Sequence, residues 1–245
     1  MKLLVCISQA PDTTSRIAFT NDDREFDSNG VQYIVNPYDE WYALVRAIEL
    51  KEQQGGSVTT ITVGGAQCDP TIRKSLAIGA DDAVRIDSEP TDAMQVARLI
   101  AEYADGKGYD IIFCGKETID HNGAVVPAML AEMLDCGFVA NATQLDVNGA
   151  EATVVREAAG GEEKVTVTLP LVLSAAKGMA EQRIPNMRGI MSARTKPLAV
   201  ESASAEGGSR IERFALPPEK GACKIIDAEN AAELIRLLRE EAKVI

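Results

Sequence analysis

The stretch DIIFCGKETIDHNGAVV, residues 110–126, is the part of the sequence that decides the fold. Its apolar beginning predicts a β-strand at residues 110–114, and the apolar run after it predicts a helix at about residues 124–134. A helix N-terminus carries unpaired N–H groups and a partial positive charge, which favour a phosphate there. We therefore expect a nucleotide or another phosphate ligand at the polar loop between them. The alternative is an ordinary strand-to-helix loop in which Asp120 caps the helix.

Strand-like apolar runs alternate with segments of helical periodicity over the first 130 or so residues, a pattern typical of a parallel sheet covered on both faces. The predicted strands are residues 3–7, 57–63, 83–86 and 110–114. The predicted helices are residues 38–53, 71–78, 91–104 and 124–134. We therefore predict a doubly wound α/β domain with a parallel sheet, whose ligands bind beyond the carboxyl ends of the strands.

The pattern changes after Cys136, where the sequence indicates an antiparallel hairpin addition and a buried strand. The predicted strands are residues 143–147, 151–157, 164–169 and 171–175, with Asn-Gly and Gly-Gly turns at 148–149 and 160–161. From Met191 the chain is polar, carries Pro217 and Pro218, and ends in a predicted helix at about residues 228–243. We expect an α/β domain at residues 1–196 and an extended C-terminal arm at residues 197–245 that docks on a partner subunit.

Composition and motifs exclude several classes of protein. A net charge of −12 argues against nucleic-acid binding, which needs a basic surface. The apolar start is too short for a signal peptide or a membrane span, so we expect a cytoplasmic protein. Five scattered cysteines without a CxxC pair predict reduced thiols and neither a metal site nor a disulfide framework.

The sequence also lacks the residues that most hydrolytic sites require. The one histidine is His121. A nucleophilic site that needs a second histidine is therefore excluded, and so is a His-rich metal site. No GxxxxGK[ST] loop occurs, and no GxGxxG follows a strand. We therefore predict a binding protein with no catalytic residue of its own, in which His121 is a loop residue near a ligand.

Five segments in order carry a resemblance to a known family. They are VCISQAPDT from Val5, NPYDEWYALVRAIELKE from Asn36, GAQCDPTIRKSLAIGADDAV from Gly65, GKETID from Gly115 and VVREAAGGEEKVTVTLPLVLSA from Val154. Together they resemble the beta subunits of electron transfer flavoproteins, in which the fourth segment reads GKQAID or GRQAID. The match runs almost from end to end of the chain.

This resemblance implies an adenine nucleotide alpha hydrolase-like fold and a heterodimer with an electron transfer flavoprotein alpha subunit. Such a heterodimer carries electrons from flavin dehydrogenases, such as acyl-CoA dehydrogenase, through FAD that is held mainly by the alpha subunit at the interface. The beta subunit would hold an AMP or a second FAD. The sequence leaves that choice open, because two features disagree. His121 and the residues after it depart from the GDTAQVG of the relatives that hold two flavins, whereas the SQAPDT start and Asp39 resemble those relatives. The alternative is a stand-alone adenine-nucleotide-binding signalling domain, which would not need the polar tail.

Carried onto this sequence, the resemblance assigns two groups of residues. The nucleotide would contact Cys6, Asn36, Pro37, Tyr38, Asp39, Val63, Gly115, Lys116, Glu117, Thr118, Ile119, Asp120, His121, Asn122, Gly123, Ala124, Val125 and Val126. Partners would be recognised by Arg183, Met187 and Glu157. Met187 takes the place of the apolar anchor in the family's dehydrogenase-recognition loop, while Glu157 matches an acid that faces the alpha subunit. Only Arg183 remains of that loop's Pro-Arg-Tyr.

Overall fold

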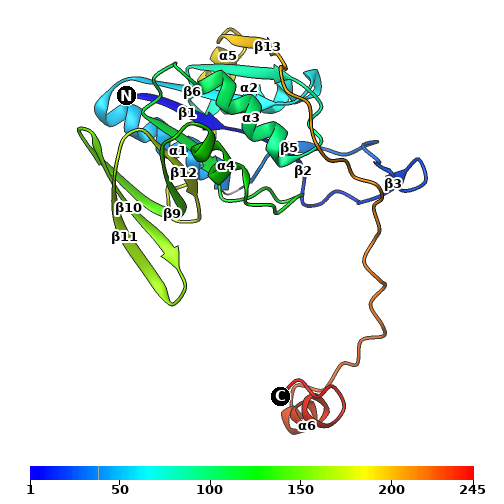
Figure 1. Ribbon diagram of the computed structural model, residues 1–245. Helices are drawn as coiled ribbons and strands as arrows, with labels where there is room; N and C mark the ends of the chain where they lie inside the picture. Colours follow the sequence, from blue (N-terminus) through cyan, green and yellow to red (C-terminus); the bar gives the residue numbers. More distant parts are fainter. Residues whose placement is uncertain (38) are drawn as a thin grey trace.

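The computed structural model describes residues 1–37 and 39–245. At its centre is one nine-stranded sheet of order β11-β10-β9-β12-β8-β1-β6-β7-β13 (Figure 1). Its strands are β1 (Lys2–Cys6), β6 (Ser57–Val63), β7 (Asp82–Asp87), β8 (Ile111–Gly115), β9 (Gly137–Asn148), β10 (Glu151–Ala158), β11 (Gly161–Thr168), β12 (Leu171–Ala175) and β13 (Leu198–Ser202). Neighbours from β9 through β12, β8, β1, β6 and β7 to β13 run parallel. The predicted doubly wound α/β fold is confirmed.

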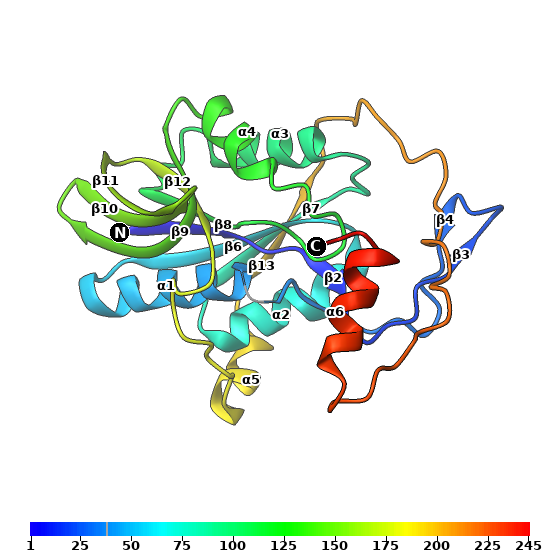
Figure 2. The ribbon, with the colours of Figure 1, turned by 90° about the horizontal axis from the view of Figure 1, so that it is seen from below.

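Helices cover both faces of this sheet. Figure 2 shows α1 and α2 on one side and α3 and α4 on the other. The helices are α1 (Asp39–Gln54), α2 (Asp69–Ile78), α3 (Ala93–Ala104), α4 (Val126–Met133), α5 (Met187–Ala193) and α6 (Ala231–Glu240), with a 3-10 turn η1 (Ala66–Cys68) before α2. Two small ribbons between β1 and α1 were not predicted, and they pair β2 (Gln9–Pro11) with β5 (Tyr33–Val35) and β3 (Phe19–Thr20) with β4 (Glu25–Phe26).

The strand β1 shows why the central strands are apolar throughout. Leu3 and Val5 belong to the core beneath α1 and α2, whereas Leu4 and Cys6 belong to the core beneath α3 and α4. Successive side chains of a strand point to opposite faces, and both faces here are buried. Each such leucine or valine contributes about 1.5–3 kcal/mol by leaving water. The run KLLVC is therefore a strand that two layers of helices enclose.

The predicted hairpin addition is confirmed, although its first strand is longer than predicted. β10 pairs antiparallel with both β9 and β11. β9 begins at Gly137, pairs parallel with β12 over its first half and antiparallel with β10 over its second half. Residues 137–142 of β9 are buried neither alternately nor throughout, so they have the apolar pattern of neither kind of strand, and sequence reasoning missed them.

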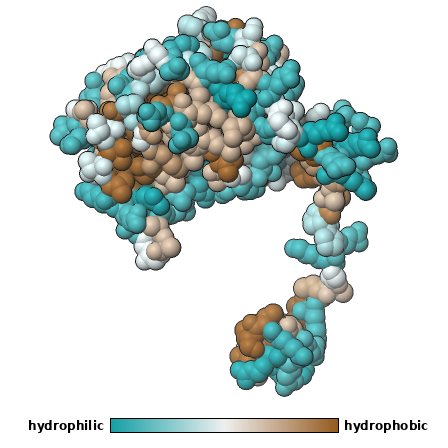
Figure 3. Space-filling view, viewed as in Figure 1, coloured by the Kyte–Doolittle hydropathy of each residue, from teal (hydrophilic) through white to brown (hydrophobic). Residues whose placement is uncertain are grey.

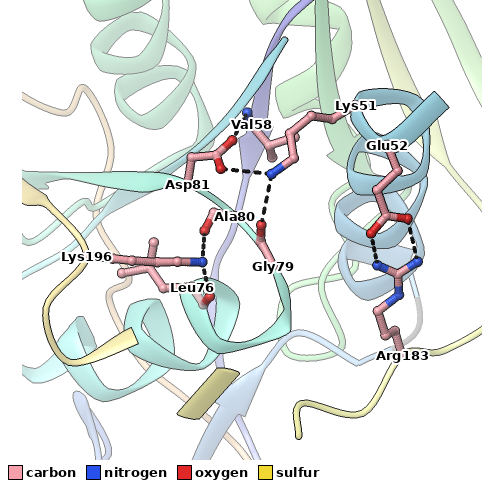
Figure 4. Close-up of polar contacts among 9 residues, drawn as sticks. All are labelled: Lys51, Glu52, Val58, Leu76, Gly79, Ala80, Asp81, Arg183 and Lys196. Atoms are coloured by element: carbon pink, nitrogen blue, oxygen red, sulfur yellow. Dashed lines mark hydrogen bonds and ion pairs between the residues drawn. The ribbon is translucent and has the colours of Figure 1, made fainter. Parts of the chain in front are cut away.

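Helix α5 and strand β13 lie in a stretch for which no element was predicted, and hydrogen bonds between this stretch and α2 attach them to the domain. Arg73 Nη1 donates to the carbonyl oxygens of Ala193 (2.8 Å) and Lys196 (2.7 Å). The Lys196 ammonium donates to the carbonyls of Leu76 (2.9 Å) and Ala80 at the end of α2 (Figure 4). β13 then pairs with β7 beyond residue 196, so the sheet extends into the predicted arm. The division at residue 197 stays a prediction.

The C-terminal arm follows the domain surface before it departs. The Asp92 carboxylate accepts hydrogen bonds from the N–H groups of Gly208 (2.8 Å) and Ser209 (2.9 Å), and the Phe214 ring stacks on Phe19 at 4.8 Å. Beyond this point the arm extends to α6, which lies away from the sheet (Figure 1). Apolar residues gather on one side of α6 (Figure 3), where Leu234 and Ile235 are 45% and 49% exposed.

None of the helices among the described residues is long and apolar enough to cross a membrane.

We predict that Lys196→Met lowers the free energy of unfolding by about 1–3 kcal/mol, because it removes a charged donor and leaves two carbonyl groups at the end of α2 without their partner. Thermal unfolding at one protein concentration measures the change. Lys220→Met, at an exposed position in the arm, serves as the control and is expected to have an effect below about 0.5 kcal/mol. Equal losses in the two variants would contradict the prediction.

Candidate functional site

The candidate site lies at the carboxyl ends of β1 and β8, where the chain changes direction across the sheet. The segment after β1 leads to α1 on one face, and the segment after β8 leads to α4 on the opposite face (Figure 2). β1 and β8 are direct neighbours in the sheet. Such a switch point is where open α/β sheets bind their ligands. The loop that we singled out from the sequence follows β8 and therefore lies there.

The Asn36 side chain joins the two segments that form this site. Its amide nitrogen donates to the Glu117 carbonyl (2.9 Å), and its amide oxygen accepts from the Ile119 N–H (3.0 Å). Asn36 is fully buried, so both bonds are shielded from water. The NPYDE segment and the GKETID loop, which are about 80 residues apart, are thereby held together. Asn36 therefore acts as a tether for the loop.

The end of this loop presents backbone donors. Asn122 and Ala124 adopt left-handed conformations (φ 49° and 53°) on either side of Gly123. Gly123, Ala124 and Val125 are exposed residues, and their N–H groups donate to no other residue in the described part of the chain. Backbone N–H groups of this kind beside a helix start are suited to an anion.

Asp120 does not cap α4, so the capping role that the alternative gave to Asp120 is wrong. The N-cap of α4 is Val125, which has no side-chain cap. The Asp120 carboxylate accepts instead from the N–H of His121 (2.9 Å). The helix start is therefore left without an anionic side chain of its own.

Two acids at the start of α1 face this site. Glu40 is buried and accepts hydrogen bonds from the N–H and hydroxyl of Ser8, both at 2.6 Å. The pKa of Glu40 is raised from 4.5 to about 8, first by burial and to a smaller extent by the charges of Asp120 and Asp39, against the hydrogen bonds from Ser8, which lower it. Burial also raises the pKa of Asp39, which Lys116 partly offsets. Sequence reasoning missed Glu40 and Ser8, and the acidic pair in NPYDE was the available signal.

Gly115 is required where β8 ends. A Cβ atom at this position would lie 2.7 Å from the Glu40 Cγ atom and 3.0 Å from the Glu40 backbone nitrogen. Contacts that short force the neighbour to move. The glycine therefore lets the first turn of α1 pack directly against the end of β8.

The other residues predicted for the nucleotide site fall around this edge of the sheet. Cys6 ends β1 and is buried, and its pKa is raised first by a hydrogen bond with Cys114 and then by burial. Val63 ends β6, the next strand, and is half-buried. The His121 side chain is 74% exposed, with Nε2 3.8 Å from the Asp120 Oδ2 atom. Tyr38 lies outside the described residues.

The three residues predicted for partner recognition do not form one cluster. Arg183 is paired within the chain, because Nη1 and Nη2 donate to the two Glu52 carboxylate oxygens at 2.8 and 3.0 Å (Figure 4). Trp41 Nε1 also donates to the Arg183 carbonyl (3.2 Å). Met187 begins α5 and is 72% exposed, while Glu157 lies on the separate hairpin, exposed on β10. Arg183 thus fixes the loop before α5 onto α1.

Comparison with known proteins gives a consistent result. The model of a family described as the electron transfer flavoprotein domain matches residues 24–206. An electron transfer flavoprotein subunit beta from Bacillus subtilis is 38% identical over 100% of both chains. The proteins of the same name from Syntrophomonas wolfei and Homo sapiens are 36% and 29% identical, over 100% of this chain and 98% and 99% of theirs. The chain therefore belongs to the electron transfer flavoprotein beta-subunit family.

Proposed function

We propose that this chain pairs with an electron transfer flavoprotein alpha subunit and that the heterodimer carries electrons between flavin dehydrogenases and an acceptor. The switch-point site would hold an adenine nucleotide, which is AMP or a second FAD, while another FAD is shared with the alpha subunit. A cytoplasmic location is part of the proposal. One observation carries the proposed nucleotide site: Asn36 tethers the loop after β8, and this loop ends in three backbone N–H donors without a described partner.

The donor set at the switch point fits the phosphate of a nucleotide. Gly123, Ala124 and Val125 are exposed residues whose N–H groups have no acceptor among the described residues. A Cβ atom at Gly123 would meet only one side-chain atom, at 3.8 Å, so a ligand has room to approach the backbone. The partial positive charge at the start of α4 adds to the attraction. An overall charge of −12 does not oppose this, because the donors act locally.

The residues of this chain would bind and orient, not react. Backbone donors of the loop would hold the phosphate, the Asn36 tether would keep the loop in place, and the ends of β1 and β6 at Cys6 and Val63 would border the adenosine. A bound flavin supplies the electron-accepting ring, and the protein supplies its binding and orientation. No residue of this subunit is proposed as catalytic.

The arm supports a partner subunit. An isolated helix of ten residues is unstable in water, and α6 has one apolar side and lies away from the sheet (Figures 1 and 3). A surface on an alpha subunit that covers this side would stabilise the helix. A stand-alone signalling domain on the same sheet would have no use for such an arm, and it stays the alternative.

The nucleotide content of the complex tests the function. We expect the chain, when co-expressed with its alpha subunit, to purify as a yellow heterodimer. Denaturation and chromatography should release either one FAD and one AMP or two FAD per heterodimer. One FAD with no second adenine nucleotide would contradict the proposed site. A chain that purifies alone and colourless would favour the signalling alternative.

We predict that Asn36→Ala weakens nucleotide binding by about tenfold or more. The substitution leaves the Ile119 N–H and the Glu117 carbonyl without partners and frees the loop, at a cost of about 1–3 kcal/mol. Equilibrium dialysis of AMP against the nucleotide-free heterodimer measures the effect. Asn29→Ala, at an exposed asparagine whose amide nitrogen donates to the Asp27 carboxylate, is the matched control. Unchanged affinity in Asn36→Ala would show that the tether is not needed.

We predict that Met187→Ala slows electron transfer from an acyl-CoA dehydrogenase by about tenfold, because an exposed apolar anchor is lost. Stopped-flow reduction of the heterodimer by the reduced dehydrogenase measures the second-order rate constant. Met94→Ala removes a methionine that is 41% exposed on α3 and should leave the rate unchanged. Equal rates for both variants would remove Met187 from the recognition surface.

A further inference from the structure

Glu40 is the one carboxylic acid that is buried among the residues that the structure describes. It lies at the switch point, where its carboxylate accepts from the N–H and the hydroxyl of Ser8 directly after β1. Its Cγ atom packs against Gly115 at the end of β8. A carboxylate that is removed from water needs a cation or several donors to stay charged. Among the described residues, both donors that Glu40 has come from Ser8 alone.

The charged groups around Glu40 favour its neutral form. From its own helix Asp39 repels a negative charge on Glu40, and so does Asp120 from the loop after β8. From β1 the nearby titratable group is the Cys6 thiol, which supplies no positive charge. The cation of the loop, Lys116, lies 3.2 Å from the Glu117 carboxylate and also attracts Asp39. Burial is the largest cause that keeps the proton on Glu40.

We propose that the Glu40 carboxylate takes up a proton when a phosphate-bearing nucleotide binds to the site. The inference rests on the proposed nucleotide function. The loop that carries the donors at residues 123–125 begins at Gly115, against which Glu40 packs, and contains Asp120, whose charge already raises the pKa of Glu40. A phosphate held by this loop therefore adds further negative charge near Glu40. The proton comes from solvent and converts the carboxylate to the neutral acid. A nucleoside without phosphate adds no charge and takes up no proton.

A pH dependence of affinity follows. In the free site Glu40 loses its proton near pH 8, and a bound phosphate shifts that loss to higher pH. The affinity for AMP should therefore fall as the pH rises above about 8, by up to tenfold per pH unit, until the bound form also ionises. Glu40→Gln, which is neutral at every pH, should lack this dependence.

Titration calorimetry tests the proposal on the nucleotide-free heterodimer. AMP is titrated at about pH 8.5, where its phosphate is fully ionised, in two buffers of different ionisation enthalpy, so that the proton count is measured. We expect several tenths of a proton taken up per AMP in the wild type and in Glu132→Gln, an exposed control on α4, and none in Glu40→Gln. Adenosine should give none in any variant. Equal uptake in the wild type and Glu40→Gln overturns the proposal.

A second measurement needs no ligand. The folded state holds the Glu40 proton up to about pH 8, whereas the unfolded state holds it only up to about pH 4.5. The contribution of Glu40 to the free energy of unfolding is therefore highest below pH 4.5 and decreases as the pH rises from there through about 8. The melting temperature of Glu40→Gln minus that of the wild type should therefore increase from about pH 5 to 8.5. A constant difference overturns the proposal.

Two further outcomes are informative. Ser8→Ala keeps Glu40 but removes one donor to its ionised form, so it should move the proton uptake to higher pH. An unchanged uptake profile in this variant counts against Glu40 as the proton acceptor. If the wild type binds neither AMP nor FAD, the nucleotide site and its proton uptake both fail, and a pH-dependent melting difference would still show that Glu40 itself carries the proton.

Discussion

The parallel pairing of β1 between β6 and β8 is the constraint on which the rest of the structure depends. Because both faces of β1 are buried, helices must cover both sides of the sheet, and they must be reached by connections that leave in opposite directions. That reversal creates the switch point between β1 and β8. The loop after β8, the start of α1 and the end of β6 come together there for this reason alone.

Two buried polar side chains lie at the switch point, and they have different roles. Asn36 satisfies backbone groups of the loop and fixes where its free donors lie. Glu40 closes the turn after β1 and lies against the end of β8, which Gly115 makes possible. One side chain is neutral and fully paired, whereas the other is ionisable and surrounded by acids. Two residues of one short segment, NPYDE, therefore have separate roles: Asn36 sets the position of the loop, and Glu40 is the ionisable group beside it.

The surfaces proposed for partners are attached to the domain in a less regular way. The loop before α5 is fixed to α1 by Arg183 and Trp41, and α5 is fixed to α2 by Arg73. α1 therefore carries the acids of the nucleotide site at its first turn and the anchor of this loop further along. The arm, by contrast, has its last contacts with the domain near Phe214 and leaves α6 for another surface.

Elements with a periodic, local pattern could be predicted from the residues alone. β6 and β12 have the predicted bounds, and α1 ends one residue later than predicted, while its predicted start lies outside the described residues. Apolar runs and helical spacing in those segments made this possible. The sequence also placed the loop of residues 115–126 and the hairpin addition. Only the tertiary structure decided the rest. α5 and β13 are held on the domain because Arg73 of α2 donates to the carbonyls of Ala193 and Lys196, while Lys196 donates to the Leu76 carbonyl of α2. Glu40 is a buried acid because Ser8 and Gly115, distant in sequence, enclose it. Contacts of that kind depend on how strands order themselves in the sheet, which no local pattern of residues specifies.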